Sequence, residues 1–354
     1  MKEYKKTMIP VIMNLQFEKL GMIDDFKSFI WTTRYYSTGD FEIVTSVNKR
    51  SMELLKRDYY VMRDDDPEYI GIIESVEADV SEEAEFTLIA KGRFLSSILG
   101  RRIIADQTQL SGLLSNGIYA LIYDAAIDPV IAKRKIANLI IGDYVGTATV
   151  EAQITGKNLL TTISNLCEKA GIGFKTSLTS DHKFKFELYE GIDRSYDQSV
   201  NSYAVFSDRF ENLLNSQYIE DASKMVTNVL VAGEGEGTDR KRIWVTNDDD
   251  PSGIDRYELY TDARSIRTDN GKITDAEYYA QLAEDGKTEL TSYTTAFTGT
   301  VDFNNIRFKT DVFMGDICSI ENSALGMYVN ARLVEVIESI DESGKYTIIP
   351  TFGL

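Results

Sequence analysis

The sequence has little of what metal binding and histidine- or cysteine-dependent catalysis require. Its 354 residues include one histidine, His182, and two cysteines, Cys167 and Cys318. A Cys/His zinc cage needs four ligands at short spacing, and these three side chains are scattered along the chain. We therefore expect no zinc site, an exposed turn around His182, and two cysteines that are small core residues rather than a disulfide.

Proline, long apolar runs and positive charge are also scarce. Five prolines against 20 tyrosines and 16 phenylalanines favour sheets over proline-rich linkers. No apolar run approaches the roughly 18 residues of a membrane span, and the start MKEYKK lacks the features of a secretory signal. The net charge of -18 argues against specific nucleic-acid binding, although an acidic wall lets a polyanion pass without sticking.

Residues 9 to about 91 alternate apolar and polar side chains with a period of two. Phe41, Ile43 and Val47 share one face of such a strand, which predicts an antiparallel sheet. Residues 37–40 (STGD) mark one turn of this sheet. The acidic run at residues 64–67 (DDDP) marks another, where we expect a solvated loop rather than a metal site.

The period changes to that of a helix over residues 92 to 172. Apolar spacing predicts helices at 93–100, 118–141 and 157–170, the last of them ending at a Gly171 cap. A short internal repeat in the sequence aligns Gly92 with Gly156. Each glycine follows a strand pattern and precedes a basic residue, so we expect a tight strand-to-helix turn at both.

From about residue 173 the chain returns to short strand patterns that continue to its end. An inserted helix is expected near 274–284, where Thr274 and Glu277 form a capping box. Ser343 and Gly344 are expected to turn the final hairpin. Together these patterns predict an α+β protein that is predominantly antiparallel β.

Two segments imitate calcium-binding loops without a full set of ligands. In DDDPSGIDRYEL, which begins at Asp248, Leu259 stands where a bidentate glutamate belongs. In IRTDNGKITDAE, which contains Asn270, the first ligand position is Ile266, which has no side-chain oxygen. We expect turns and a helix cap there, no metal, and no cofactor. Since no nucleophile, base or phosphate loop stands out, we also expect that the protein is not an enzyme.

Six segments, taken in chain order, resemble a family of siphovirus tail proteins typical of phages and prophages of Gram-positive bacteria. They are FIWTTRYYSTGDFEI, YIGIIESV, AKGRFLSSILGRRII, FELYEGIDRSYDQSVNSYAVFSDRFENL, NVLVAGEGEG, and the closing stretch from GDICSI to PTFGL. The resemblance runs nearly end to end. Its most family-like residues are Gly92, Leu95, Leu99, Arg101, Arg102, Ile103, Gly191, Asp193, Arg194, Ser195, Phe206 and Ser207.

The resemblance implies a tail-tip or baseplate hub protein, similar to the N-terminal part of tail-associated proteins. Such a hub closes a tail tube of six-fold rings and adapts it to a three-fold tip, so it implies a homotrimer with two tube-type β-barrels per chain. It implies a first barrel domain at 1–105 that ends in a short helix, and a helix-rich, then α/β, peripheral domain at 106–200. A second barrel domain with the inserted helix is expected at 201–354.

The resemblance also implies partners and a location. Distal-tail or tail-tube hexamer proteins would lie above the hub, and tip, fibre or spike proteins below it. DNA would be only passing cargo, and no membrane insertion is expected. The protein would be assembled in the host cytoplasm and lie at the tail tip or baseplate of the virion. No catalytic residue carries over, and we expect no peptidase or lysozyme module because the chain stops at Leu354.

Two readings stay open for the charged residues among these motifs. Arg101 and Arg102 follow a short apolar helix, where a cation meets the helix C-terminus favourably; the alternative is a contact to a carboxylate of another chain. Residues 193–195 (DRS) are expected to form a turn held by an Asp side chain, the alternative being an interface ion pair.

A function of another class competes with the hub. The protein would be a carbohydrate-binding or carbohydrate-active β protein of the host-adsorption apparatus. Its 20 tyrosines and many acidic side chains would supply stacking faces and hydrogen bonds. Release of reducing sugar from host wall polysaccharide would favour this alternative.

Overall fold

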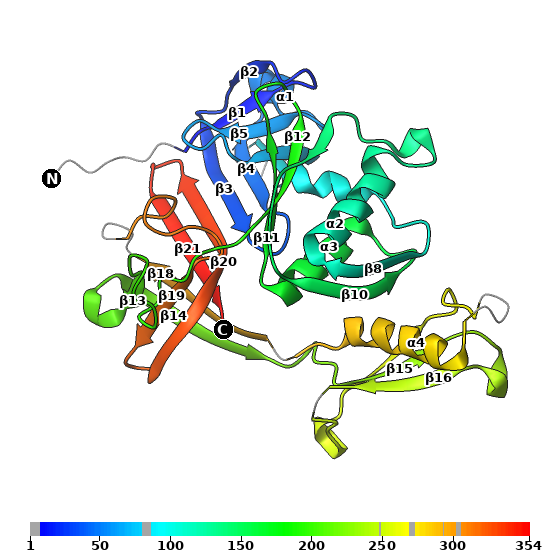
Figure 1. Cartoon of the computed structure of the whole chain (residues 1–354). Coiled ribbons are helices and arrows are strands. Elements are labelled where there is room, and N and C mark those ends of the chain that lie inside the picture. The colour runs from blue at the N-terminus through cyan, green and yellow to red at the C-terminus, as the bar shows by residue number, and fades with distance from the viewer. Residues whose placement is uncertain (1–7, 80–85, 248, 269–272, 293, 302–305) are drawn as a thin grey trace.

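The computed structural model describes residues 8–79, 86–247, 249–268, 273–292, 294–301 and 306–354. Thirteen strands of this described part form one large sheet, and smaller sheets of two or three strands accompany it (Figure 1). Most of the strand pairs are antiparallel, and helices lie mainly in the middle of the chain. The chain is therefore an α+β protein with mostly antiparallel β structure, as the sequence predicts.

The N-terminal half of the large sheet contains seven strands. They are β1 (Pro10–Met13), β2 (Lys19–Met22), β3 (Phe26–Arg34), β4 (Asp40–Ser46), β5 (Tyr60–Arg63), β6 (Ile70–Asp79) and β7 (Thr87–Phe94). All pairs among them are antiparallel, which confirms the sheet predicted for residues 9 to 91. One helix of this half, α1 (Lys49–Leu54), was not predicted; Asn48 caps it through reciprocal hydrogen bonds with Ser51.

The C-terminal half of the large sheet contains the remaining six strands. They are β13 (Val205–Ser207), β14 (Leu213–Asp221), β18 (Thr294–Val301), β19 (Ile317–Asn322), β20 (Met327–Asp341) and β21 (Tyr346–Gly353). The long strand β20 joins the two halves, because its first part pairs with β19 and its last part with β3. The predicted hairpin turn at Ser343 and Gly344 is confirmed, with Gly344 at φ 78°.

The two halves form one continuous sheet instead of two separate ones. The strand order runs β14-β18-β21-β20-β3-β4-β7-β6-β5-β1-β2, and β13 and β19 branch from β20. Within the described residues these pairings do not close into a barrel, and β14 and β2 form the two ends. The two-barrel architecture and the three-domain division therefore stay predictions.

The central region, residues 95–190, packs helices against small sheets. Its elements are η1 (Leu95–Arg101), β8 (Thr108–Leu113), α2 (Leu114–Ile122), η2 (Tyr123–Ile127), η3 (Ala132–Arg134), β9 (Leu139–Ile141), β10 (Thr149–Ile154), α3 (Leu159–Ala170), β11 (Gly173–Leu178) and β12 (Phe184–Tyr189). They bury one shared apolar core. In the part of the chain described here, every helix is too short or too polar to cross a membrane.

Two of the three helices predicted in this region differ from the structure. The 93–100 segment is a 3₁₀-helix, η1, and the 118–141 segment is not one helix. There α2 continues into a π-helical turn, η2, and ends before Pro129, which has no N–H to continue a helix. The 157–170 prediction is confirmed: α3 is capped by Asn158 and ends at Gly171, whose φ of 69° is left-handed.

The sequence predicted a tight strand-to-helix turn at both Gly92 and Gly156, and this prediction is wrong for Gly92. Gly156 has a φ of 70° and makes the turn before α3. Gly92 instead lies inside β7, paired with Phe41 on one side and Ile73 on the other. A Cβ there would overlap the backbone carbonyl of Ile72, so close packing, and not a turn, requires this glycine.

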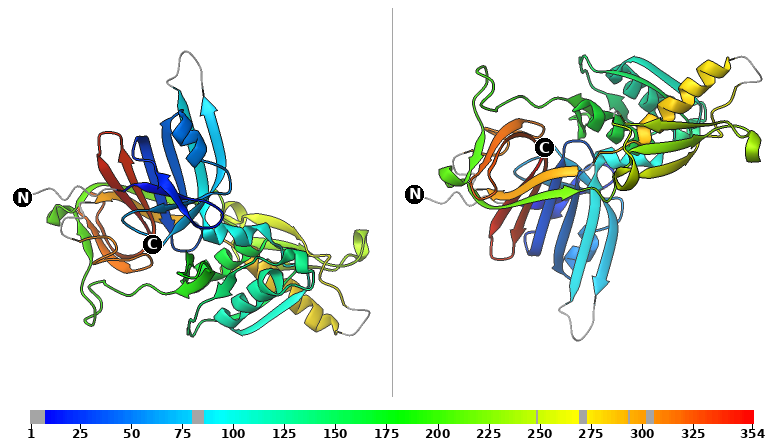
Figure 2. Two further views of the ribbon diagram at one scale, coloured as in Figure 1. Left: turned by 90° about the horizontal axis from the view of Figure 1, so that it is seen from above. Right: turned by 90° about the horizontal axis from the view of Figure 1, so that it is seen from below.

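A small unit, here called the insert lobe (residues 226–291), is inserted between β14 and β18. Three strands, β16 (Arg242–Thr246), β15 (Asn228–Ala232) and β17 (Glu258–Asp262), form its sheet, and α4 (Asp275–Glu289) covers one face. Val229 and Tyr278 belong to its separate apolar core. The capping box of Thr274 and Glu277 is confirmed, and α4 extends beyond the predicted 274–284. Figure 2 places the lobe beside the central region, on the side opposite the β6–β7 hairpin.

Both cysteines are free and buried, as predicted, and their reactivity tests the packing around them. Cys167 lies on the buried face of α3 and Cys318 in β19. Burial raises the pKa of the Cys167 thiol to about 12, which leaves almost no thiolate near neutral pH. We expect no labelling of the native chain by a disulfide reagent at pH 8, and two thiols after unfolding in urea. Rapid labelling of native Cys167 or Cys318 would contradict this packing.

Candidate functional site

The first group of motif residues surrounds the junction of β7 and η1. Leu95 is fully buried in the central core, and Gly92 lies three residues before it in β7. Arg101 occupies the last turn of η1, which agrees with the reading of a cation at the helix C-terminus. Arg102 donates hydrogen bonds to the backbone carbonyls of Arg134, at 2.6 Å, and of Arg101. These residues thus fasten η1 within this chain.

The second motif group lies far along the chain, against the start of β19. The Asp193 carboxylate accepts a hydrogen bond from the Ser195 N–H at 2.8 Å, so the predicted Asp-held turn is confirmed. Arg194 forms a buried ion pair within the chain, with its Nε 2.6 Å from the Asp316 carboxylate. Gly191 is needed because a Cβ there would overlap the backbone of Gly315. This group fastens the segment before β13 to the C-terminal half of the sheet.

The structure also contains a polar cluster that no motif pointed to, where the two halves of the sheet meet. We call it the junction cluster; its members are Arg63, Asp65, Asp66, Lys309, Glu338 and Tyr346. Arg63 lies at the end of β5 and Glu338 in β20, and both side chains have no exposed surface. The Arg63 Nη1 lies 2.6 Å from the Glu338 carboxylate, and two further guanidinium nitrogens bind Asp65 at 2.9 and 2.6 Å.

The remaining members of the cluster add hydrogen bonds and attraction to this buried charge. Tyr346 on β21 donates its hydroxyl hydrogen to the second oxygen of Glu338 at 2.6 Å. Lys309 pairs with Asp66 and lies 3.6 Å from Glu338. The sequence predicted that this acidic loop would be solvated, and that prediction is wrong for two of its residues: Asp65 pairs with the buried Arg63, and Asp66 pairs with the half-buried Lys309. The cluster ties β5, its following loop, β20, β21 and the segment around Lys309 together.

The pKa shifts at this junction agree with an Arg63 guanidinium that stays charged and a Tyr346 hydroxyl that stays protonated. Burial alone would lower the pKa of the Arg63 guanidinium, but hydrogen bonds and attraction to Asp65 and Glu338 outweigh burial and raise it. Burial and the neighbouring Glu338 carboxylate raise the pKa of Tyr346, so its hydroxyl keeps the proton that it donates. The arrangement stabilises one relative position of the sheet halves.

The sequence contained a signal for this cluster. In β20, Ala331, Leu333, Val336 and Ile340 are buried, and Glu338 stands in the same inward series. A charged side chain at an inward position of an alternating strand must find a partner, because burying it alone is very costly. The partner itself could not be identified, since Arg63 is 275 residues away along the chain.

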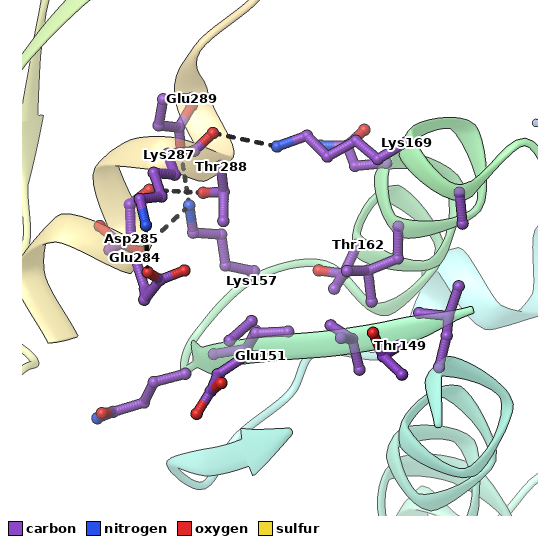
Figure 3. Close-up of a pocket in the computed structure, with 18 of the residues that line it drawn as sticks. Thr149, Glu151, Lys157, Thr162, Lys169, Glu284, Asp285, Lys287, Thr288 and Glu289 are labelled. Carbon is purple, nitrogen blue, oxygen red and sulfur yellow. Dashed lines mark hydrogen bonds and ion pairs between the residues drawn. The ribbon is translucent and has the colours of Figure 1, made fainter. Parts of the chain in front are cut away.

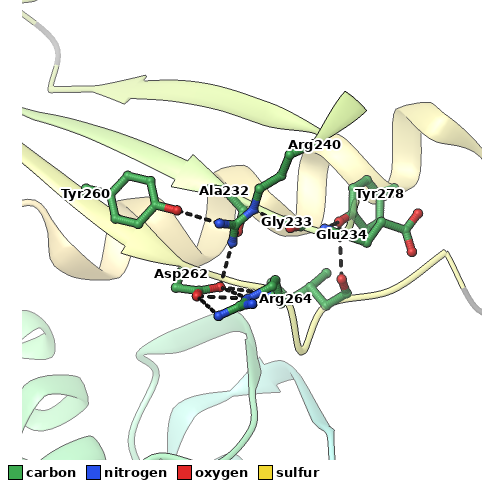
Figure 4. A network of polar contacts seen from close by, with 9 residues as sticks. Ala232, Gly233, Glu234, Arg240, Tyr260, Asp262, Arg264 and Tyr278 are labelled. Carbon is green, nitrogen blue, oxygen red and sulfur yellow. Dashed lines mark hydrogen bonds and ion pairs between the residues drawn. The ribbon is translucent and has the colours of Figure 1, made fainter. Parts of the chain in front are cut away.

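A second polar network lies on the insert lobe (Figure 4). Arg240 donates to the backbone carbonyls of Ala232 and Gly233, to the Tyr260 hydroxyl and to the Asp262 carboxylate, at 2.6 to 2.9 Å. Arg264 also binds Asp262. Hydrogen bonds from Arg264 and Arg240 lower the pKa of Asp262 to about 2. The network fixes the loops at one end of the lobe sheet.

The structure also gives the positions of His182 and of part of the calcium-like loops. His182 lies in an exposed turn between β11 and β12, as predicted. Asp248 and Asn270 lie outside the described residues, and Asp250 accepts hydrogen bonds from Asn228 and Arg256. Among the residues that the structure describes, no three His, Cys, Asp or Glu side chains gather closely enough to hold a metal ion.

The comparisons with known proteins point to phage tails. A family model described as "Siphovirus ReqiPepy6 Gp37-like protein" matches residues 10–354. No curated protein matches the chain in sequence. Because the family match spans nearly the whole sequence, it covers both sheet halves, the central region and the insert lobe.

Three solved structures share the fold over nearly the whole chain. Prophage tail protein gp18 from Listeria monocytogenes EGD-e has a TM-score of 0.51 at 14% identity, covering 98% of this chain and 94% of its own. The tail protein from Neisseria meningitidis MC58 has a TM-score of 0.55 at 12% identity, covering 99% and 97%. The 43 kDa tail protein of prophage MuSo2 from Shewanella oneidensis has a TM-score of 0.54 at 12% identity, covering 98% and 97%. At such identities the likeness shows the fold alone.

Proposed function

Because the chain belongs to the Siphovirus ReqiPepy6 Gp37-like protein family, a family of siphovirus tail proteins, we propose that it is the structural hub of a phage or prophage tail tip or baseplate. The hub closes the hexameric tail tube and adapts it to a three-fold tip, as a homotrimer. Its partners are distal-tail or tail-tube proteins above and tip, fibre or spike proteins below. The protein acts by shape and assembly and not as an enzyme.

The observation that carries this proposal is the continuous sheet with open ends. β14 is nine residues long, has β18 as its one strand partner among the described residues, and exposes Leu214, Tyr218 and Ile219. A long, exposed, partly apolar edge strand is a template for pairing with another chain unless the assembly covers it. A closed ring of copies covers such edges, and a heterologous contact that repeats around an axis closes into that ring.

Each chain has two sheet halves, and each half could contact one subunit of the six-fold ring above it. Three chains with two such surfaces each would match a six-fold ring above while keeping three-fold symmetry below. The junction cluster fits this role because it fixes the position of one half against the other. We propose that each half curls as a tube-type barrel in the assembled trimer, and that the domain limits 1–105, 106–200 and 201–354 describe the assembly units.

The charge of the chain fits a channel wall. A net charge of -18 would repel DNA as it passes and would prevent it from sticking. In this proposal DNA is cargo, the residues Gly92, Leu95, Arg101, Arg102, Gly191, Asp193, Arg194 and Ser195 hold the shape of the subunit, and the protein lies at the tail tip after assembly in the host cytoplasm.

Cryo-microscopy of purified tails, with a label fused to this chain, tests the hub proposal. We expect three copies in one layer, between the last six-fold ring of the tube and the tip. Unlabelled tails of the same phage serve as the control for the added density. Label repeated along the tube, six copies per layer, or labelled protein that never enters the tail would each contradict the proposal.

A further inference from the structure

A groove lies between the central region and the insert lobe. α3 and α4 form its walls and β10 its floor, and the cavity has a volume of about 370 Å³ (Figure 3). At one end Lys157 closes it by an ion pair with Glu289 on α4 at 2.6 Å. The Lys169 ammonium reaches across the groove to the Lys287 backbone carbonyl at 3.2 Å. α4 also lies close to β10 and Ala152–Ile154 are buried, so the accessible part of the floor is Thr149–Glu151.

The floor of this groove is an unpaired strand edge. Every residue from Ala148 to Ile154 lines the cavity. Successive side chains of a strand point to opposite faces, so a cavity that touches all of them runs along the edge of the strand. β10 pairs with β8 on its other side, and within the described residues its backbone makes no ladder on this side. Of its six residues, Thr149, Val150 and Glu151 are accessible while Ala152, Gln153 and Ile154 are buried, so the accessible edge is about 10 Å long.

Three polar side chains in the groove have unused bonding capacity. The Gln153 side chain is 6% exposed, and neither its amide oxygen nor its nitrogen has a hydrogen-bond partner. A buried amide without partners is costly, so an isolated Gln153 calls for an explanation. Across the described part of the chain, Glu151 forms no ion pair, and Lys169 meets only the Lys287 carbonyl and no carboxylate.

We propose that this groove binds an extended segment of a partner polypeptide, which adds a strand to the free edge of β10. The segment has alternate apolar side chains, with one acidic side chain near Lys169 and one basic side chain near Glu151. Backbone groups of the segment pair with β10, as in other cases of strand addition, and also satisfy the Gln153 amide. Leu166 and Ala170 of α3, together with Val150, provide the apolar wall.

The charges favour this occupant over others. Lys157 and Lys287 already have carboxylate partners in Glu289 and Glu284. What remains is one cation and one anion at different places along the strand, which a peptide with both charges complements and a simple anion does not. The pKa of Lys169 is lowered, first by burial, so this ammonium gains most from a carboxylate that joins it in the groove.

Hydrogen exchange of purified tails compared with the isolated chain tests the proposal. The proposal takes from the proposed function only that the chain is part of a tail. We expect amides of residues 149–154 to exchange at least tenfold more slowly in tails than in the isolated chain. A photo-crosslinking residue in place of Thr149 should join to an extended segment of a different tail protein. Equal exchange in both samples, or a crosslink only to another copy of this chain, would overturn the inference.

Matched variants separate the groove from general folding effects. Lys169→Glu should abolish the protection of β10 in tails, while Lys133→Glu, the same charge change at an exposed lysine outside the groove, should keep it. Gln153→Leu should leave the isolated chain as stable as before or more stable, yet reduce the protection in tails. If Lys169→Glu keeps full protection, the groove does not bind the segment; the hub proposal is judged separately, by where the chain lies in the tail.

Discussion

Replacing Arg63 with methionine is expected to destabilise the isolated chain by about 3–5 kcal/mol, the usual cost of removing one partner of a buried ion pair. Arg63 and Glu338 are both fully buried, so the carboxylate left behind would lie in a low-dielectric interior. Lys309, at 3.6 Å, and the Tyr346 hydroxyl would compensate only in part. Urea unfolding followed by circular dichroism measures the loss.

The matched control is Arg93→Met. Arg93 also binds a glutamate, Glu74, at 2.7 Å and also belongs to the N-terminal half of the sheet, but its side chain is 48% exposed. An exposed pair contributes between about 0 and 1 kcal/mol, because water replaces the lost partner. Equal losses for Arg63→Met and Arg93→Met would contradict the view that burial makes the junction cluster important.

A double variant separates two costs: the loss of the Arg63–Glu338 attraction, and the cost of leaving the Glu338 carboxylate buried without its guanidinium. If Arg63→Met deprives the buried Glu338 carboxylate of its guanidinium partner, adding Glu338→Leu should recover part of the stability, so the two changes together cost less than their sum. Additive losses would mean that the two side chains act independently. The size of the departure from additivity measures the coupling between β5 and β20 through this pair.

Local patterns in the sequence were enough to predict the N-terminal antiparallel strands and two of the helix caps. The period of two between residues 9 and 91 corresponds to strands whose buried positions alternate, as in β4, where Phe41, Ile43 and Thr45 face the core. The cap at Gly171 and the capping box at Thr274 each depend on a few neighbouring residues and are confirmed. Such features need no knowledge of the rest of the chain.

Strands and sheet pairings that depend on residues far apart in the sequence could not be predicted from local patterns. The 118–141 helix was extended through an apolar stretch, but Leu139–Ile141 forms β9, which pairs in parallel with β12 about 45 residues later. A short apolar run fits a strand or a helix until its neighbour is known. The order of the large sheet, with β20 beside β3, likewise joins segments at opposite ends of the sequence.

For two of the family-like glycines, the sequence identified the residue but the structure was needed to explain it. The sequence marked Gly92 and Gly191, but it suggested the wrong reason for glycine at residue 92, a strand-to-helix turn, and no reason at residue 191. The structure supplies the reason in both cases: a backbone from another segment, Ile72 or Gly315, passes where a Cβ would be. A tight approach between two backbones is a property of packing, and local propensity does not predict it.

Gly92→Ala is expected to destabilise the chain by more than about 3 kcal/mol, at or above the upper end of ordinary overpacking in a core. The added Cβ would overlap the Ile72 carbonyl oxygen and also crowd the Phe41 ring. Gly92 pairs with strands on both sides, so β7 cannot move away from β6 without breaking its pairing with β4. Chemical denaturation, or the soluble yield where the variant fails to fold, measures the effect.

Gly21→Ala is the matched control, since Gly21 also lies in a strand of the same sheet. A Cβ at Gly21 would meet the Leu54 methyl groups at 3.4 and 3.5 Å, which is ordinary van der Waals contact. This substitution should leave stability unchanged or raise it by up to about 1 kcal/mol, because alanine has fewer unfolded conformations than glycine. If both substitutions were tolerated equally, the close approach of β6 and β7 would be wrong. The register that places Gly92 opposite Ile73 would then need to shift, and with it the face that β7 presents to the core.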